Sequence, residues 1–153
     1  MTTQTPRFRW IGITDECVEC QKCGKTELRS TVVLAMLDED GNTEDYTYYG
    51  STCAARALGI RGGGRSVLNS ARAAHEHTLE TAKDARRTLA YYGLPETGEV
   101  DAETLRAAMI TYVGSNSNVH RLVRETGKKV STMVMEMLAG LRAAIAEAEM
   151  LRR

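Results

Sequence analysis

Four cysteines are the residues of this chain whose type and spacing indicate chemistry. Cys17, Cys20 and Cys23 stand at intervals of three in ECVECQKCGK, and Cys53 follows thirty residues after the last of them. Two thiolates separated by two residues can turn toward one ion, and Gly24 allows the backbone to fold beneath it. In a reducing compartment, clustered cysteines are more often metal ligands than disulfides. The pattern therefore predicts a metal site made of sulfur.

The remaining ligands follow from the predicted helix over 51–59. Cys53 would lie in its first turn, where the helix N-terminus favours a thiolate. Cys17 would complete an all-thiolate tetrahedral site; otherwise a histidine or a water completes it. The histidines are His75, His77 and His120. No H-x-E-type arrangement supplies a general base, so the expected ion is a structural Zn²⁺.

A second cofactor fits part of the pattern. C-x2-C-x2-C with one remote cysteine also holds iron–sulfur clusters. Here Ala54, where such ligands often have proline, follows Cys53, and the knuckle glycine Gly24 favours a single ion. Zinc is therefore the preferred cofactor, an iron–sulfur cluster is the alternative, and buried thiols without a ligand are the third interpretation.

Short elements must position these cysteines. Apolar alternation, β-branched runs and the Asp40-Gly41 turn predict three strands and then a short helix, at 7–13, 31–37, 45–50 and 51–59. Tyr46 and Tyr48 would share one face of the third strand. Apolar spacing of three and four predicts further helices at 66–92, 101–113 and 118–151. Gly127 is a candidate for a kink in the last of them.

The order of knuckle, hairpin and a ligand in the first helical turn resembles a treble-clef zinc finger. The segments CQKCGK, TVVL and YYGSTCAARALG are also similar to those of small actinobacterial and phage proteins, over about residues 10 to 62. The resemblance implies a zinc-binding fold and little about activity. The usual fourth ligand of a treble clef lies one turn after the third, where this chain has Arg56 and Ala57.

These features predict an α+β protein. A small zinc-stabilised β-hairpin unit, treble-clef-like, would occupy 1–60, followed by a glycine hinge at 61–65. An α-helical bundle or helical hairpin with a long C-terminal helix would occupy 66–153. A structural zinc adds on the order of 10 kcal/mol to a unit that is too small to bury an adequate core.

The function that these features favour is a non-enzymatic adaptor that binds another protein or a second copy of itself. No base, nucleophile or phosphate-binding loop accompanies the cysteines. The last predicted helix carries an apolar stripe that is a candidate homodimer surface. The residues proposed for self-association are Val130, Met133, Val134, Met137 and Leu141.

Nucleic-acid binding is the alternative function. Lys+Arg and Asp+Glu both number 20, so no global charge favours it, although a local basic patch would suffice. The candidate contacts are Arg7, Arg9, Lys22, Lys25 and Arg29. The start MTTQTPRFRW lacks the apolar core of a signal peptide, and no apolar run approaches the ~18 residues of a membrane span. A cytoplasmic protein without a membrane partner is therefore expected.

Overall fold

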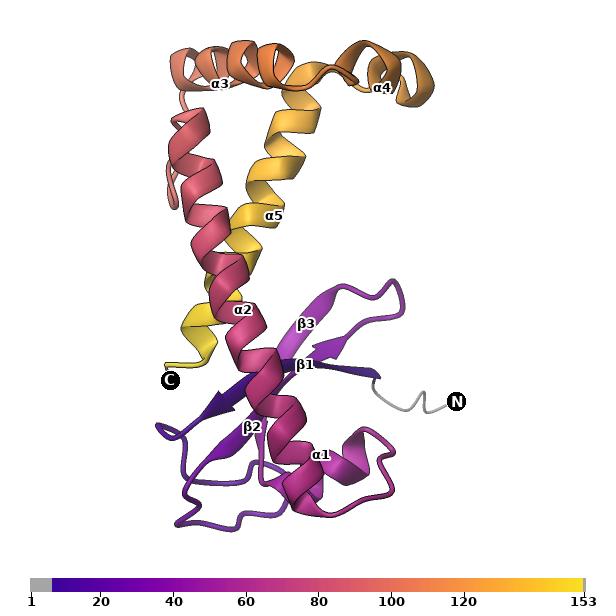
Figure 1. Ribbon diagram of the computed structural model, residues 1–153, viewed down its shortest axis with the longest axis vertical. Coiled ribbons are helices and arrows are strands. Elements are labelled where there is room, and N and C mark those ends of the chain that lie inside the picture. The colour runs from indigo at the N-terminus through magenta and orange to yellow at the C-terminus, as the bar shows by residue number, and fades with distance from the viewer. Residues whose placement is uncertain (1–6, 153) are drawn as a thin grey trace. The chain divides into compact units, whose positions relative to one another are not determined.

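The computed structural model describes residues 7–152. Residues 1–6, on which the expected absence of a signal peptide partly rests, lie outside this range. The predicted α+β class is confirmed: a three-stranded antiparallel sheet precedes the helices, and the last helix is long (Figure 1). Within 7–152, none of the helices combines the length and the apolar character that a bilayer crossing requires.

The sheet has the order β1-β2-β3 and matches the predicted strands within two residues. Its strands are β1 (Arg7–Thr14), β2 (Thr31–Leu37) and β3 (Thr43–Tyr49). The central strand β2 is buried on both faces, which is why its sequence is a continuous apolar run. Val32 and Leu34 belong to one core cluster, Val33 and Ala35 to the other, and all four are fully buried.

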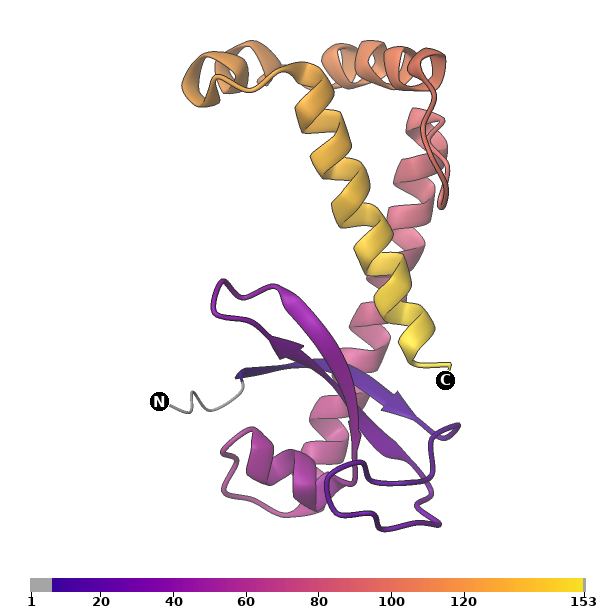
Figure 2. The ribbon, with the colours of Figure 1, turned by 180° about the vertical axis from the view of Figure 1, so that it is seen from behind.

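Different segments of the chain pack on the two faces of the sheet. On one face, α1 (Ser51–Ala57) and the start of α2 (Gly64–Tyr92) contribute buried alanines and Val67 to the cluster around Val32. Figure 1 shows the first half of α2 crossing in front of the strands, and Figure 2 shows the strands from the other side. The second face packs Ile11, Leu151 and the tyrosines 46 and 48, which share a face as predicted.

Helix α2 also covers the outer edge of β1. The register of β1 shifts between Trp10 and Gly12, and the carbonyls of Ile11 and Ile13 beside this shift contact side chains of α2. Thr78 donates its hydroxyl proton to the carbonyl of Ile11 at 2.7 Å, and Nδ1 of His75 lies 2.8 Å from the carbonyl of Ile13. Side-chain bonds of this kind occupy an edge that would otherwise be open to a foreign strand.

Contacts divide the chain into two compact units. One consists of residues 7–80 and 147–152 of the described range, and the other of 81–146. The boundary lies inside α2 and not at the glycine segment 61–65, because the first half of this helix packs on the sheet through Val67 and Ala71. The helix begins at Gly64, so the last two residues of the expected hinge are helical.

The second unit contains the second half of α2, α3 (Ala102–Ser115), α4 (Val119–Thr126) and residues 130–146 of α5 (Val130–Met150). The predicted continuous helix over 118–151 is wrong. Gly127 adopts a left-handed conformation (φ 68°) that ends α4, and α5 begins three residues later.

Candidate metal centre

Cys20 and Cys23 lie in a tight turn before β2. Gly24 has a φ of +70°, and its N–H donates to the carbonyl of Cys20 at 2.8 Å. The N–H of Cys20 in turn donates to the carbonyl of Lys25 at 2.9 Å. These two bonds bend the segment back on itself, as the glycine at this position predicted.

A pair of hydrogen bonds fastens this turn to β3. The N–H of Gln21 donates to the carbonyl of Tyr48, and the N–H of Tyr48 donates to Oε1 of Gln21, both at 2.9 Å. Strand β3 leads directly into Gly50, the N-cap residue of α1, so the turn is held beside the start of that helix. A Cβ on Gly50 would lie only 3.9 Å from Sγ of Cys20.

Three sulfur atoms therefore meet. The Sγ atoms of Cys20, Cys23 and Cys53 all lie within 4.8 Å of one another; Cys20 and Cys53 are buried, and Cys23 is exposed. A Zn–S bond of about 2.3 Å implies sulfurs about 3.8 Å apart around a tetrahedral ion. The group thus has a spacing that could hold a metal ion. The prediction that Cys53 reaches the knuckle is confirmed.

The fourth cysteine lies outside this group. Cys17 is half-buried, and its thiol is 3.5 Å from the carbonyl of Glu19. The carbonyl of Cys17 accepts a hydrogen bond from the hydroxyl of Thr31, which ties the segment to the first residue of β2. None of the three histidines belongs to the sulfur group within residues 7–152. The structure therefore assembles three of the four predicted ligands.

The two buried thiols have opposite pKa shifts. Burial raises the pKa of Cys53 to about 11, helped by its contacts with the thiols of Cys23 and Cys20. This direction is opposite to the one that the position of Cys53 in the first turn of α1 predicts, and burial is its largest cause. For Cys20, burial also acts to raise the pKa, but backbone N–H groups led by that of Gly50 bring it down to about 7.

The five candidate nucleic-acid contacts do not form one surface. Arg7 pairs in register with Leu37 at one end of the sheet, whereas Thr14 pairs with Thr31 at the other. Lys22, Lys25 and Arg29 all lie in the segment that joins Thr14 to Thr31. Seven residues of strand separate the two groups by roughly 20 Å.

Two of these basic residues have partners within the chain. Arg9 forms an ion pair with Glu147 and donates to the hydroxyl of Thr43 at 3.1 Å. Its hydrogen bond with Glu147 raises the pKa of the guanidinium. Nζ of Lys22 lies 5.8 Å from the ring centroid of Tyr49, a cation–π distance.

The proposed self-association stripe is mostly used inside the chain. Met133 and Val134 are 8% and 0% exposed, so they are core residues and present no surface to a partner. Val130, Met137 and Leu141 are half-buried. The large apolar side chains that are exposed in this unit include Ile110 and Val113 on α3, which the sequence analysis did not select.

Sequence reasoning also missed two features of the first unit. One is Gln21, whose amide oxygen takes the place of a strand carbonyl beside β3. The other is a pocket to which Arg72 on α2 and Arg29 both contribute. Neither has a sequence signal, because each depends on elements that meet only in the folded chain.

No protein family, curated protein or solved structure in the comparisons matches this chain. The resemblance to treble-clef zinc fingers therefore stays a prediction. The geometry of the three sulfurs is what the functional proposal has to build on.

Proposed function

We propose that this chain is a non-enzymatic zinc-binding module with a role in protein interaction. One observation carries the metal part: three sulfurs from two segments thirty residues apart lie within 4.8 Å of one another. The backbone N–H groups directed at Cys20 support it, since they stabilise a thiolate. Burial of two of the three cysteines supports a structural role.

Zinc is preferred to an iron–sulfur cluster for two reasons. In a [4Fe–4S] cluster each cysteine binds a different iron, and in a [2Fe–2S] cluster no more than two cysteines share one. Three cysteine sulfurs around a cluster therefore cannot all lie as close together as three around one ion. The mutual separation below 4.8 Å supports a single ion. The knuckle with Gly24 at positive φ supports it too.

Cys17 is the proposed fourth ligand. It lies three residues before Cys20, in a segment whose residues 15–19 are exposed or half-buried. The contact that its thiol would have to give up, with the carbonyl of Glu19 at 3.5 Å, is long and weak. A water molecule is the alternative ligand.

Metal analysis of the purified chain tests this assignment. We expect one zinc per chain, and Co²⁺ substitution should give the visible spectrum of a tetrahedral thiolate site. Cys53→Ser should abolish tight binding, whereas Thr52→Ser, the matched change on the neighbouring exposed residue, should not. Cys17→Ser tests whether the site has four thiolate ligands or three. If Cys17 is a ligand, this change should lower the intensity of the sulfur-to-cobalt charge-transfer band; if it is not, the intensity should stay the same. A brown protein containing iron, or a colourless one without zinc, would refute the assignment.

The interaction role is supported by exposed apolar side chains. Ile110 is 66% exposed and Val113 is 41% exposed, and both line an apolar cavity of about 420 Å³ with Met109. Self-association is the form of this role that the purified chain can test alone. We expect the mass in solution to rise with concentration and Ile110→Glu to keep the chain monomeric. A monomer at every concentration would refute self-association.

Nucleic-acid binding remains the alternative. The location of Lys22, Lys25 and Arg29 in one segment supports it, and the separate position of Arg7 weighs against it. A gel shift at low salt is the test, because phosphate contacts weaken steeply as salt rises. Retardation that disappears with salt would favour this alternative over the adaptor.

A further inference from the structure

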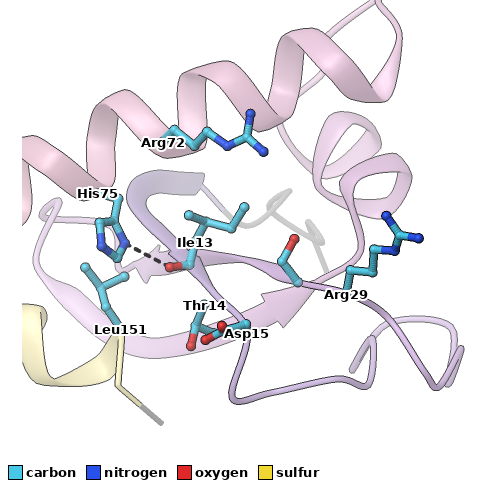
Figure 3. A pocket seen from close by; sticks show the side chains of 8 residues that line it. Ile13, Thr14, Asp15, Arg29, Arg72, His75 and Leu151 are labelled. Atoms are coloured by element: carbon cyan, nitrogen blue, oxygen red, sulfur yellow. Dashed lines mark hydrogen bonds between the residues drawn. The ribbon is translucent and has the colours of Figure 1, made fainter.

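The first unit contains a pocket at the end of the sheet from which the cysteine segment leaves (Figure 3). Its volume is about 440 Å³. Three parts of the chain line it: the end of β1, the residues just before β2, and α2. Its polar lining residues are Thr14, Asp15, Arg29, Ser30, Arg72 and His75.

Two arginines from different elements contribute to this pocket. Arg72 is on α2 and Arg29 precedes β2; Figure 3 shows both side chains extended. Both are exposed, and neither forms a hydrogen bond or an ion pair with another residue in the described range. Arg9, by contrast, is paired with Glu147 in the same unit. A guanidinium presents five N–H donors in a fork that matches phosphate oxygens.

Hydroxyl donors lie beside the arginines. Thr14 is only 4% exposed, and its hydroxyl oxygen accepts the N–H of Glu16 at 3.3 Å, which leaves its own proton to donate. Ser30 is half-buried in the lining. The hydrogen bond from Nδ1 of His75 to the carbonyl of Ile13 holds that ring in the wall of the pocket.

We propose that this pocket binds a small phosphorylated molecule, and that the exposed side chains of Arg29 and Arg72, which extend apart in Figure 3, turn toward its phosphate on binding. The volume lies within the range of about 300–1,000 Å³ that is usual for small-molecule sites. A bare phosphate would fill only a small part of it. The lining carries two positive charges against one negative, so it retains attraction for an anion.

The carboxylate of Asp15 indicates which kind of phosphorylated molecule the pocket would prefer. This carboxylate is exposed in the lining and has no partner among residues 7–152. It would repel a bare anion, but it can accept hydrogen bonds from hydroxyl groups on the rest of the ligand. A sugar phosphate, with the phosphate at the arginines and hydroxyls at Asp15, satisfies both ends. This inference goes beyond the proposed function and does not depend on the identity of the metal.

Amide chemical-shift titration of the full, metal-loaded chain tests the proposal. The probes are ribose 5-phosphate, inorganic phosphate and unphosphorylated ribose. We expect saturable shifts at the pocket with ribose 5-phosphate, weaker binding of inorganic phosphate, and none of ribose. Arg29→Gln and Arg72→Gln should each weaken binding by about 10–100-fold, since each removes charge-assisted hydrogen bonds.

Arg7→Gln is the matched control, because it removes the same charge from an exposed position at the opposite end of the sheet. This control should change the affinity by no more than about twofold, whereas the two pocket variants should each change it by at least about tenfold, which corresponds to about 1.4 kcal/mol. Asp15→Asn should reduce the preference for ribose 5-phosphate over inorganic phosphate. Equal loss with Arg7→Gln, or shifts that never saturate, would overturn the site. Equal affinity for the two phosphates in the wild-type chain would overturn the ligand class.

Discussion

Removal of the metal is expected to release residues 15–30 while the sheet stays folded. Within this segment only Cys20 is buried. Four hydrogen bonds hold it to the strands: two between Gln21 and Tyr48, one from Thr31 to the carbonyl of Cys17, and one from the N–H of Glu16 to the hydroxyl of Thr14. At about 0.5–1.5 kcal/mol each they contribute about 2–6 kcal/mol. The proposed zinc would supply on the order of 10 kcal/mol and would therefore dominate the order of the segment.

The sheet has a different source of stability. Val32, Val33, Leu34 and Ala35 of β2 are fully buried and belong to two apolar clusters that contain no cysteine. Burying a side chain of this kind contributes about 1.5–3 kcal/mol for each valine or leucine. The short length of the first sixty residues predicted that zinc compensates for a core that is too small. The structure instead places the sheet in a core completed by α2 and the end of α5.

Hydrogen exchange measured by mass spectrometry on metal-loaded and chelator-treated protein distinguishes these expectations. Peptides from 15–30 should exchange at least about a hundredfold faster without metal, which corresponds to a loss of about 2.8 kcal/mol of local protection. Peptides from β2 should keep their protection. Cys53→Ser should reproduce this pattern in 15–30 although it lies outside that segment, and Thr52→Ser should not.

Two results would refute this reasoning. Loss of protection in β2 together with 15–30 would mean that the metal supports the whole unit. If hydrogen exchange in 15–30 is the same with and without metal, then an ion bound by the three sulfurs does not order this segment.

Three further changes test the fold around the site. Thr78→Val leaves the carbonyl of Ile11 without its 2.7 Å bond and should cost about 1–3 kcal/mol in urea unfolding followed by the single tryptophan. Gly12→Ala places a methyl 3.0 Å from Cα of His75 and should cost about 1–3 kcal/mol in the same assay; an unchanged midpoint would contradict this close packing. The first-turn N–H that bonds to Asp101 lowers the pKa of its carboxyl, so Asp101→Ala should lower the thermal midpoint at neutral pH. The difference in thermal midpoint between the wild-type chain and Asp101→Ala should disappear as the pH falls through the pKa of Asp101 in the folded protein, and circular dichroism can measure it.

Local patterns in the sequence were enough for the strands and the knuckle. The β-branched run at 31–37 predicted β2 residue for residue, because a strand buried on both faces needs no polar alternation. The spacing of Cys20 and Cys23 with Gly24 predicted a turn that the structure contains. Asp101, the first residue of the helix predicted over 101–113, caps α3, since capping depends on residues within one turn.

Features that depend on contacts between distant segments required the tertiary structure. Periodicity identified α2 as a helix but could not show that its first half packs on the sheet, because an apolar stripe does not specify its partner. The same limit applies to Met133, which was assigned to a partner and lies in the chain's own core.

The sequence by itself thus determined which cysteines could share an ion and which segments would be strands. Only the folded chain decided that Cys17 lies outside the group of three sulfurs that Cys53 joins as predicted. It also brought Arg29 and Arg72 to one pocket. The physical reason is that spacing along the chain controls hydrogen bonds within a turn or a helix. Burial and long-range pairing depend on how those elements pack.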